Sequence, residues 1–310
     1  VATGIALILA STFAMAFADA VVKLVSSDMT VWQVFAARSL FAVPCLLVLA
    51  VWQGSRLHPV APVWILARSA LLVLTWLAYY ASLPVLTLPV AAVAVYTNPI
   101  ITALLSALLL GERVTGRQWL GVFLGFCGVA VILKPGTDAF SWAIVLPLMA
   151  AAFYSLAMIL TRARCRDENA VTLAVGLHLS FLVTGLVAAG ILGLTAMDRQ
   201  TVAAYPFLLE TWPTMATGDW ALMAFLGLLS AAFFLGVARA YQIAPPQIIG
   251  TFDYGYLVSA AIWGMVFFAD KPDALTILGM ILITAAGILV AARGSGRVPV
   301  AAPAKAGPDG

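Results

Sequence analysis

The sequence predicts an all-α integral membrane protein with ten transmembrane helices, arranged as two inverted repeats of five helices each. Three observations support this: 64% of the 310 residues are hydrophobic, only 9% are charged, and ten apolar segments of spanning length follow one another. Because a soluble domain carries about 25% charged residues, a chain with a mean hydropathy of +1.07 cannot cover a water-facing surface. Lipid is therefore the expected outer solvent, which excludes a soluble enzyme.

The apolar segments define the helices. A spanning helix needs about 20 mainly apolar residues. With that window, we expect helices at 2–25, 31–53, 64–83, 89–110, 117–134, 141–162, 172–194, 219–241, 246–268 and 274–292.

The helices divide the chain into a first repeat over 1–135, a second repeat over 140–293 and a disordered tail over 294–310. One connection between helices, 195–218, is long. Its aromatic residues suit the membrane interface, where such rings are enriched; they are Tyr205, Phe207 and Trp212.

Basic residues predict which side of the membrane each loop faces. With a cytoplasmic N-terminus, nine of them fall on the inner side and four on the outer side. The inner nine are Arg56, Arg113, Arg117, Arg162, Arg164, Arg166, Arg293, Arg297 and Lys305, and the outer four are Lys23, Lys134, Arg199 and Lys271. Because cytoplasmic loops carry the excess of Lys and Arg, we expect both termini inside.

The two halves of the chain resemble each other. The run 110–113 (Leu-Gly-Glu-Arg) is similar to the run 268–271 (Phe-Ala-Asp-Lys), and an offset of 140 places Arg38 on His178. Each half holds five helices, an odd number, so the second half must enter the membrane from the opposite side. Such inverted repeats are typical of alternating-access carriers, which hold substrate near the midplane between the halves.

A family resemblance rests on the first half. The run 90–99 (Val-Ala-Ala-Val-Ala-Val-Tyr-Thr-Asn-Pro), the run 110–115 (Leu-Gly-Glu-Arg-Val-Thr) and then Gly121, Gly125 and Gly128 resemble the end of an EamA domain. That family belongs to the drug/metabolite transporter (DMT) superfamily. The second half matches it more loosely. Within the family, the chain most resembles the YddG-type exporters of aromatic amino acids and other metabolites.

The resemblance implies a multi-pass protein of the bacterial inner membrane with both termini in the cytoplasm. It implies a carrier that exports amino acids, aromatic and other neutral ones, and related small metabolites by alternating access. The expected partners are a small-molecule substrate and the lipid bilayer, with the chain a monomer or a weak dimer. No cofactor is implied.

Aromatic and amide side chains lie deep in three of the predicted helices, 64–83, 89–110 and 246–268. They are Trp76, Tyr79, Tyr80, Tyr96, Asn98, Tyr254 and Tyr256. The first three share one helical face, since they follow the i, i+3, i+4 spacing. Lipid offers no hydrogen-bond partner, so these groups predict an aromatic-lined, polar substrate cavity between the three helices. Simple hydrogen bonds between helices are the alternative.

Ionisable residues inside a membrane are costly and indicate function. Asp253 is a candidate to bind a substrate ammonium or a coupling proton, or to pair with Arg239. Arg38 is a candidate to bind a substrate carboxylate; otherwise it extends to the interface or bonds backbone carbonyls. His178, at the mirrored position, is a second candidate for the substrate site or an ordinary interior histidine.

For two further charged residues we expect simpler roles. Asp19 lies six residues from the outer end of its helix beside Lys23, which suggests a position at the interface. Arg68 lies near the inner end of its helix, where a long side chain can extend to water.

Helix-breaking residues predict where the carrier bends. Pro99 stands in the middle of the fourth helix, where it removes one backbone hydrogen bond. Gly250 and Gly255 would let the ninth helix bend or approach a neighbour. These three are the candidate hinge or gating residues.

Other functional classes find little support. No Gly-x-Ser-x-Gly or His-Glu-x-x-His motif is present, so a membrane enzyme lacks a candidate catalytic site. Cys45, Cys127 and Cys165 show no metal-ligand spacing, and scattered basic residues offer no nucleic-acid surface. A receptor or scaffold remains open, as does a DMT carrier for a nucleotide sugar or for a lipophilic cation or drug.

Overall fold

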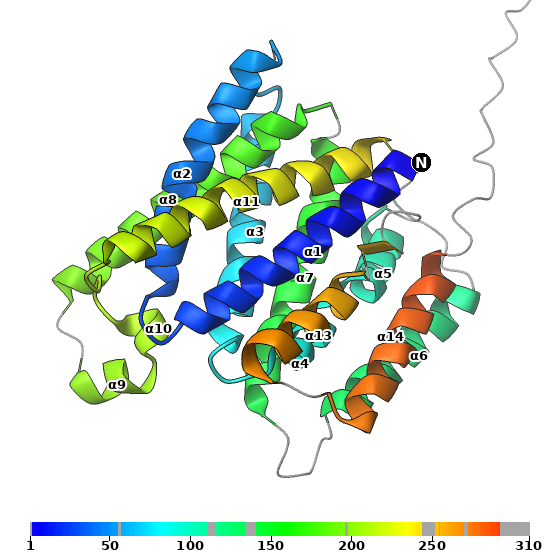
Figure 1. The fold of residues 1–310 in the computed structure, drawn as a ribbon. Coiled ribbons are helices and arrows are strands. Elements are labelled where there is room, and N and C mark those ends of the chain that lie inside the picture. The colour runs from blue at the N-terminus through cyan, green and yellow to red at the C-terminus, as the bar shows by residue number, and fades with distance from the viewer. Residues whose placement is uncertain are drawn as a thin grey trace, which may run out of the picture.

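The computed structural model describes residues 2–54, 57–110, 116–133, 141–165, 167–195, 198–243, 252–253, 255–269 and 272–291. Within these ranges the chain forms helices joined by turns and short connections, and no strand (Figure 1). Gly250, Tyr254 and the tail over 294–310 lie outside the described residues.

The helices follow the predicted order. The first half comprises α1 (Ala2–Val25), α2 (Val31–Trp52), α3 (Pro62–Ser82), α4 (Leu88–Val95), α5 (Asn98–Leu110) and α6 (Gly116–Leu133). The second half comprises a 3-10 turn (Trp142–Ile144), α7 (Val145–Arg164), α8 (Ala170–Leu194), α9 (Arg199–Ala204), α10 (Pro206–Leu209), α11 (Thr217–Ile243), α13 (Gly255–Phe268) and α14 (Ala274–Ala291).

In the described part of the chain, six helices are long and apolar enough to cross a membrane, and four further apolar helices are shorter. Together they account for the ten predicted spans, so the all-α membrane fold is confirmed.

Polar caps determine where several helices begin. Thr30 and Gln33 form a capping box at the start of α2, in which each side chain accepts a backbone N–H of the other residue. The Asn169 side chain caps α8 by accepting one hydrogen bond, from the backbone N–H of Val171. Asp198 caps α9 through the backbone and hydroxyl of Thr201, and these hydrogen bonds lower the pKa of its carboxyl group.

The fourth predicted helix is not continuous. It was expected to run over 89–110, whereas the structure divides it into α4 and α5. Pro99 explains the break, because it has no N–H to donate to the carbonyl four residues earlier. Polar side chains occupy the gap: the Thr97 hydroxyl donates to the carbonyl three residues before it (2.8 Å), and Ser155 of α7 donates to the Asn98 carbonyl (3.0 Å).

The contacts between helices occur in matched pairs. Replacing each helix by the equivalent helix of the other half converts one contact of a pair into the other. The α3–α7 contact has its counterpart in α1–α11, α2–α11 in α3–α8, and α1–α13 in the packing of α4 and α5 on α7. The contacts α2–α8 and α6–α14 join equivalent helices directly, and the second pair lies side by side in Figure 1. An inverted repeat produces this pattern.

The long connection between α8 and α11 packs over the start of α2. The indole N–H of Trp32 and the amide of Gln33 donate to carbonyls of this connection, at 2.8 and 2.6 Å. Phe207 is only 3% exposed and packs inside the protein, whereas Tyr205 is 60% exposed. The difference arises because the connection folds back onto the bundle.

Two glycines let neighbouring helices approach α2 on either side of Arg38. A Cβ on Gly185 of α8 would lie 2.6 Å from the Trp32 carbonyl oxygen. A Cβ on Gly227 of α11 would lie 2.4 Å from the carbonyl oxygen of Arg38 itself. The backbone that carries Arg38 is therefore held between two close helix contacts.

We expect Gly227→Ala to destabilise the protein, because its methyl group would meet backbone rather than a flexible side chain. Overpacking of this kind costs about 1–3 kcal/mol, which thermal unfolding in detergent would detect. Gly190→Ala is the matched control, since a Cβ there has no neighbour within 4 Å. Equal unfolding temperatures for the two variants would contradict the close packing of α11 on α2.

Candidate functional site

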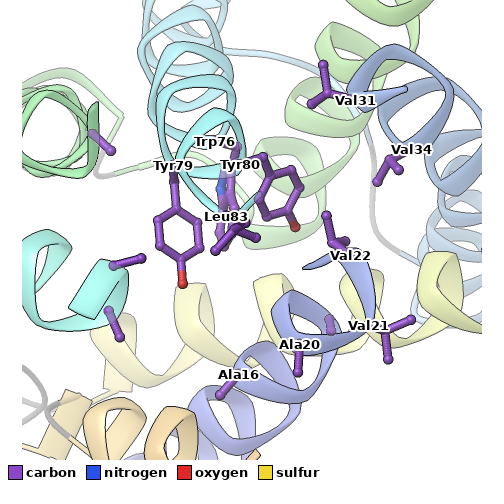
Figure 2. Packing of buried hydrophobic residues seen from close by; sticks show 14 of the residues in the cluster. Ala16, Ala20, Val21, Val22, Val31, Val34, Trp76, Tyr79, Tyr80 and Leu83 are labelled. Atoms are coloured by element: carbon purple, nitrogen blue, oxygen red, sulfur yellow. The ribbon is translucent and has the colours of Figure 1, made fainter. Parts of the chain in front are cut away.

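The aromatic face predicted for the third helix lies buried in the centre of the bundle. Trp76, Tyr79 and Tyr80 all face inward from α3. The Trp76 ring contacts both tyrosine rings edge-on, with centroids 6.0 and 5.2 Å apart. Figure 2 shows the two tyrosines extending from α3 toward the turn of α1 that carries Ala16 and Ala20. Their hydroxyls therefore reach a neighbouring helix.

A chain of hydrogen bonds joins these hydroxyls to a carboxylate on α1. Arg38 Nη1 donates to the Tyr80 hydroxyl (2.9 Å), which donates in turn to Asp19 Oδ1 (3.2 Å). The Tyr256 hydroxyl donates to Asp19 Oδ2. Because the Tyr256 hydroxyl proton is used in this hydrogen bond, the Tyr256 oxygen accepts a hydrogen bond from the Tyr79 hydroxyl, 2.8 Å away. Four helices thus meet at one carboxylate, and we call these five residues the central network.

Asp19 is the candidate site residue that sequence reasoning missed. It was expected at the membrane interface beside Lys23, but it is fully buried (0% exposed). Lys23 instead donates to the carbonyls of Leu83 and Leu86, at 3.0 and 2.5 Å, beyond the end of α3. The small residues around Asp19, which are alanines on both sides, were the available signal, because small residues permit close helix contacts.

Arg38 is buried as completely as its partner, with 1% of its surface exposed. Its guanidinium lies over the rings of Tyr80 and Phe181, 5.8 and 5.4 Å from their centroids. Cation–π attraction is strongest where the cation is desolvated. The structure therefore excludes the alternative that Arg38 extends to the membrane surface.

His178 lies next to this arginine, on α8. Its Nδ1 is 3.4 Å from the hydroxyl of Ser39, the residue after Arg38. Its ring also contacts Phe181, the same ring on which Arg38 rests. The two positions matched by the repeat, Arg38 and His178, therefore meet where α2 packs on α8.

A second set of candidate residues adjoins the central network. Tyr96, at the end of α4, stacks on the Tyr256 ring with centroids 4.9 Å apart and planes 18° apart. Its hydroxyl donates to Asp253 Oδ1 at 3.4 Å. Asn98 is buried at the start of α5. A Cβ on Gly255 would lie 2.8 Å from a methyl group of Leu9, so α13 approaches α1 closely there.

The structure thus brings most of the predicted site together. The side chains that meet in one connected group are Trp76, Tyr79, Tyr80, Tyr96, Asp253, Tyr256 and Arg38. The alternative interpretation, hydrogen bonds between helices, describes contacts that these tyrosines do make, and the substrate cavity stays a prediction. Within the described ranges, no group of three or more His, Cys, Asp or Glu side chains could hold a metal ion.

Polar contacts also join the start of α3 to the end of α7. Arg68 Nε donates to the Thr161 hydroxyl at 2.7 Å, and the Ala61 N–H donates to Glu168 Oε1 at 2.7 Å. Arg68 was expected to extend to water, but it is buried. The tight packing of α3 on α7 encloses it, which the position along one helix could not reveal.

Residues 2–134 of the chain match the EamA-like transporter family. This match covers less than half of the chain, the segment predicted as the first repeat. The match agrees with the resemblance predicted from the sequence, and the apolar helices indicate a multi-pass membrane protein.

Several curated transporters are similar to this chain over most of its length. The riboflavin transporter of Rhizobium johnstonii is 27% identical, over 86% of this chain and 80% of that protein. The S-adenosylmethionine uptake transporter of Rickettsia prowazekii is 23% identical, over 93% and 92%. The pseudopaline exporter of Pseudomonas aeruginosa is 25% identical, over 92% and 95%.

A solved crystal structure shares the fold of this chain. It superposes with a TM-score of 0.62 over 91% of this chain and 97% of that chain, at 17% sequence identity. The finer resemblance to YddG-type exporters stays a prediction, because the named relatives carry other solutes.

Proposed function

We propose that this protein carries amino acids or metabolites that contain an amino-acid group across the bacterial inner membrane by alternating access. The observation that carries the proposal is the central network. A carboxylate and a guanidinium, both fully desolvated, face each other through one tyrosine hydroxyl inside the membrane-spanning bundle. Charged groups at such depth are expensive and mark substrate or ion pathways.

The proposed substrate-binding residues surround that network. They are the predicted set of Trp76, Tyr79, Tyr80, Tyr96, Asn98, Asp253, Tyr254, Tyr256, Arg38 and His178, to which the structure adds Asp19. The aromatic rings suit the flat or apolar part of a metabolite, and the charged groups suit its polar part.

The proposed transport cycle uses contacts that can open at one end of the bundle while the other end stays closed. At one end, α3 and α7 are joined by the Arg68–Thr161 hydrogen bond. Toward the other end, the central network joins α1, α2, α3 and α13. The break before Pro99 lies between them and makes α4 and α5 a discontinuous helix, a common feature of carrier binding sites. We assign the hinge role to Pro99 and Gly255, with Gly250 as the further candidate.

The named solutes of three relatives support the proposal. S-adenosylmethionine is by name a derivative of the amino acid methionine, and its uptake transporter matches this chain over 93% of its length. The pseudopaline exporter, which matches over 92% of this chain, supports the proposed direction because its name describes an exporter. Riboflavin, the solute of a third relative, is a flat molecule, for which the aromatic part of the site is the natural surface.

The proposed direction is export. The sequence contains no nucleotide-binding loop, so ATP does not drive this chain directly. A carrier without an energy source moves solute down its gradient, which points outward for metabolites made in the cytoplasm. The excess of basic residues on the predicted inner loops supports a cytoplasmic position for both termini under the same proposal.

Counterflow in proteoliposomes tests the proposal. Vesicles that contain the purified protein and an unlabelled amino acid inside should accumulate the same labelled amino acid, saturably and beyond protein-free vesicles. The panel should contain neutral, aromatic and sulfur-containing amino acids, with riboflavin, a nucleotide sugar and a lipophilic cation as alternative solutes. A carrier that moved only the alternative solutes would refute the amino-acid class, and one that moved nothing would refute transport of this kind.

A parallel series with an imposed pH gradient separates proton coupling from facilitated diffusion. Coupling through Asp253 requires that net flux follow the gradient in the wild type and lose that dependence in Asp253→Asn. Flux that ignores the gradient in both proteins would show facilitated diffusion.

A further inference from the structure

Arg38 has a pair of unused hydrogen-bond donors. Nη1 is engaged by Tyr80, but Nε and Nη2 have no partner among the described residues, although the side chain is 99% buried. Leaving donors of a buried cation unsatisfied costs free energy. Nε and Nη2 lie on the same edge of the guanidinium plane and donate in parallel, which is the geometry that holds both oxygens of a carboxylate. The free edge therefore matches an anionic ligand.

The surroundings of Arg38 hold this edge in a fixed orientation. The guanidinium rests on the Tyr80 and Phe181 rings, and Gly227 brings α11 against the Arg38 backbone. His178 Nε2, next to the same phenylalanine, is a further buried nitrogen without a partner in the described part of the chain. Fixed, desolvated donors bind a ligand with little reorganisation, as recognition sites require.

Asp19 offers the opposite charge on the other side of Tyr80. Each carboxylate oxygen accepts one tyrosine hydroxyl. An ionised carboxylate has about four acceptor positions, so both oxygens can accept a further donor. The hydroxyls of Tyr80 and Tyr256 contact it and Tyr79 contacts Tyr256, so three aromatic rings lie close by, and aromatic faces attract an ammonium group. The place beside Asp19 therefore suits a cationic group with several N–H donors.

We propose that Asp19 and Arg38 form the two poles of one binding site, which receives the ammonium and the carboxylate of an α-amino-acid group. This inference rests on the proposed transport function and specifies its substrate class. A single hydroxyl, with hydrogen bonds of 2.9 and 3.2 Å, separates the poles. That short separation suits the two charges of an amino acid, which one carbon atom separates.

Charge balance favours a zwitterion over a simple cation or anion. The poles compensate each other in the buried site, so a ligand with both charges leaves the net charge of the site unchanged. A ligand with only one charge would bring an uncompensated charge into the membrane interior, which is strongly unfavourable. The rest of the ligand is less restricted, so larger molecules that carry the same group belong to the proposed class.

Ligand derivatives test the two poles on the purified full-length protein in detergent. We would measure competition against labelled L-phenylalanine by L-phenylalanine itself, by phenylalaninamide, which lacks the carboxylate, and by 3-phenylpropionate, which lacks the ammonium. Hydrogen bonds to charged groups contribute about 1.5–3 kcal/mol each, so each derivative should bind about 10- to 100-fold more weakly. Equal affinity for either derivative, or no binding of L-phenylalanine, would overturn the two-pole site.

Variants of each pole should give a crossed pattern. Asp19→Asn should bind 3-phenylpropionate as well as L-phenylalanine, whereas Arg38→Gln should bind phenylalaninamide as well as L-phenylalanine. The controls are Asp28→Asn and Arg199→Gln, whose side chains are exposed. Variants that weaken all three ligands equally would show a merely structural role and overturn the assignment. If a variant does not fold, as judged by gel filtration, the derivative series on the wild type decides.

The outcomes separate this inference from the proposed function. Discrimination between the derivatives without counterflow of any amino acid would refute the transport function and leave the two-pole site standing. Counterflow of amino acids without discrimination would leave the transport function standing and overturn the two-pole site.

Discussion

Asp19→Asn is expected to reduce amino-acid counterflow by about 100-fold, the upper end of what one hydrogen bond to a charged group contributes. The side-chain amide keeps the size of the carboxylate but carries no charge and brings two N–H donors. Tyr80 and Tyr256 both donate toward this position, so one of them would meet a donor instead of an acceptor. The variant also leaves Arg38 buried without a compensating anion.

The same substitution should lower stability. Removing one partner of a buried charge pair costs about 3–5 kcal/mol, and the tyrosine hydroxyl between Asp19 and Arg38 places the effect toward the lower value. Thermal unfolding in detergent and counterflow would be measured on the same preparation. Asp28→Asn, at an exposed position after α1, serves as the control and should leave both unchanged. Normal transport by Asp19→Asn would remove Asp19 from the site.

The second large effect concerns the hydroxyl that links the two charges. Tyr80→Phe keeps the ring contacts with Trp76 and Phe35 but removes one oxygen atom. Arg38 Nη1 then loses its acceptor and Asp19 Oδ1 loses a donor. Because both partners are charged and buried, we expect a loss of about 2–4 kcal/mol in the free energy of unfolding.

A graded series makes this prediction specific. Tyr79→Phe removes one hydrogen bond between neutral groups and should cost about 1 kcal/mol. Tyr256→Phe, which removes a donor to the carboxylate, should fall between the two. Tyr205→Phe, in the long connection and mostly exposed, is the control with no expected effect. If Tyr79→Phe proved as damaging as Tyr80→Phe, the hydrogen-bond directions assigned to the central network would be wrong.

The local pattern of the sequence was sufficient for the fold. Apolar run length predicted the spans, and the odd number of helices in each half predicted the inverted repeat. The i, i+3, i+4 spacing placed Trp76, Tyr79 and Tyr80 on one face, as the structure confirms. These features depend on residues within one helix turn or one span, so the sequence records them directly.

Other features depend on how the helices pack against one another. For these residues, the position along a single helix gave the wrong prediction of exposure to water. Asp19 and Arg68 were both expected near water, yet each is enclosed by a neighbouring helix that approaches closely. The break between α4 and α5 had a visible cause in Pro99, but a proline can also bend a helix without dividing it. Only the packing partners determined which outcome applied.

The chain by itself therefore determined that this is a ten-helix membrane protein with two related halves and a deep aromatic face, because lipid imposes those properties on each segment separately. The tertiary structure alone decided that the aromatic face surrounds the Asp19 carboxylate and the Arg38 guanidinium. The reason is physical: a buried charge must find partners on other helices, and the network joins α1, α2 and α3 to α13 in the second half of the chain.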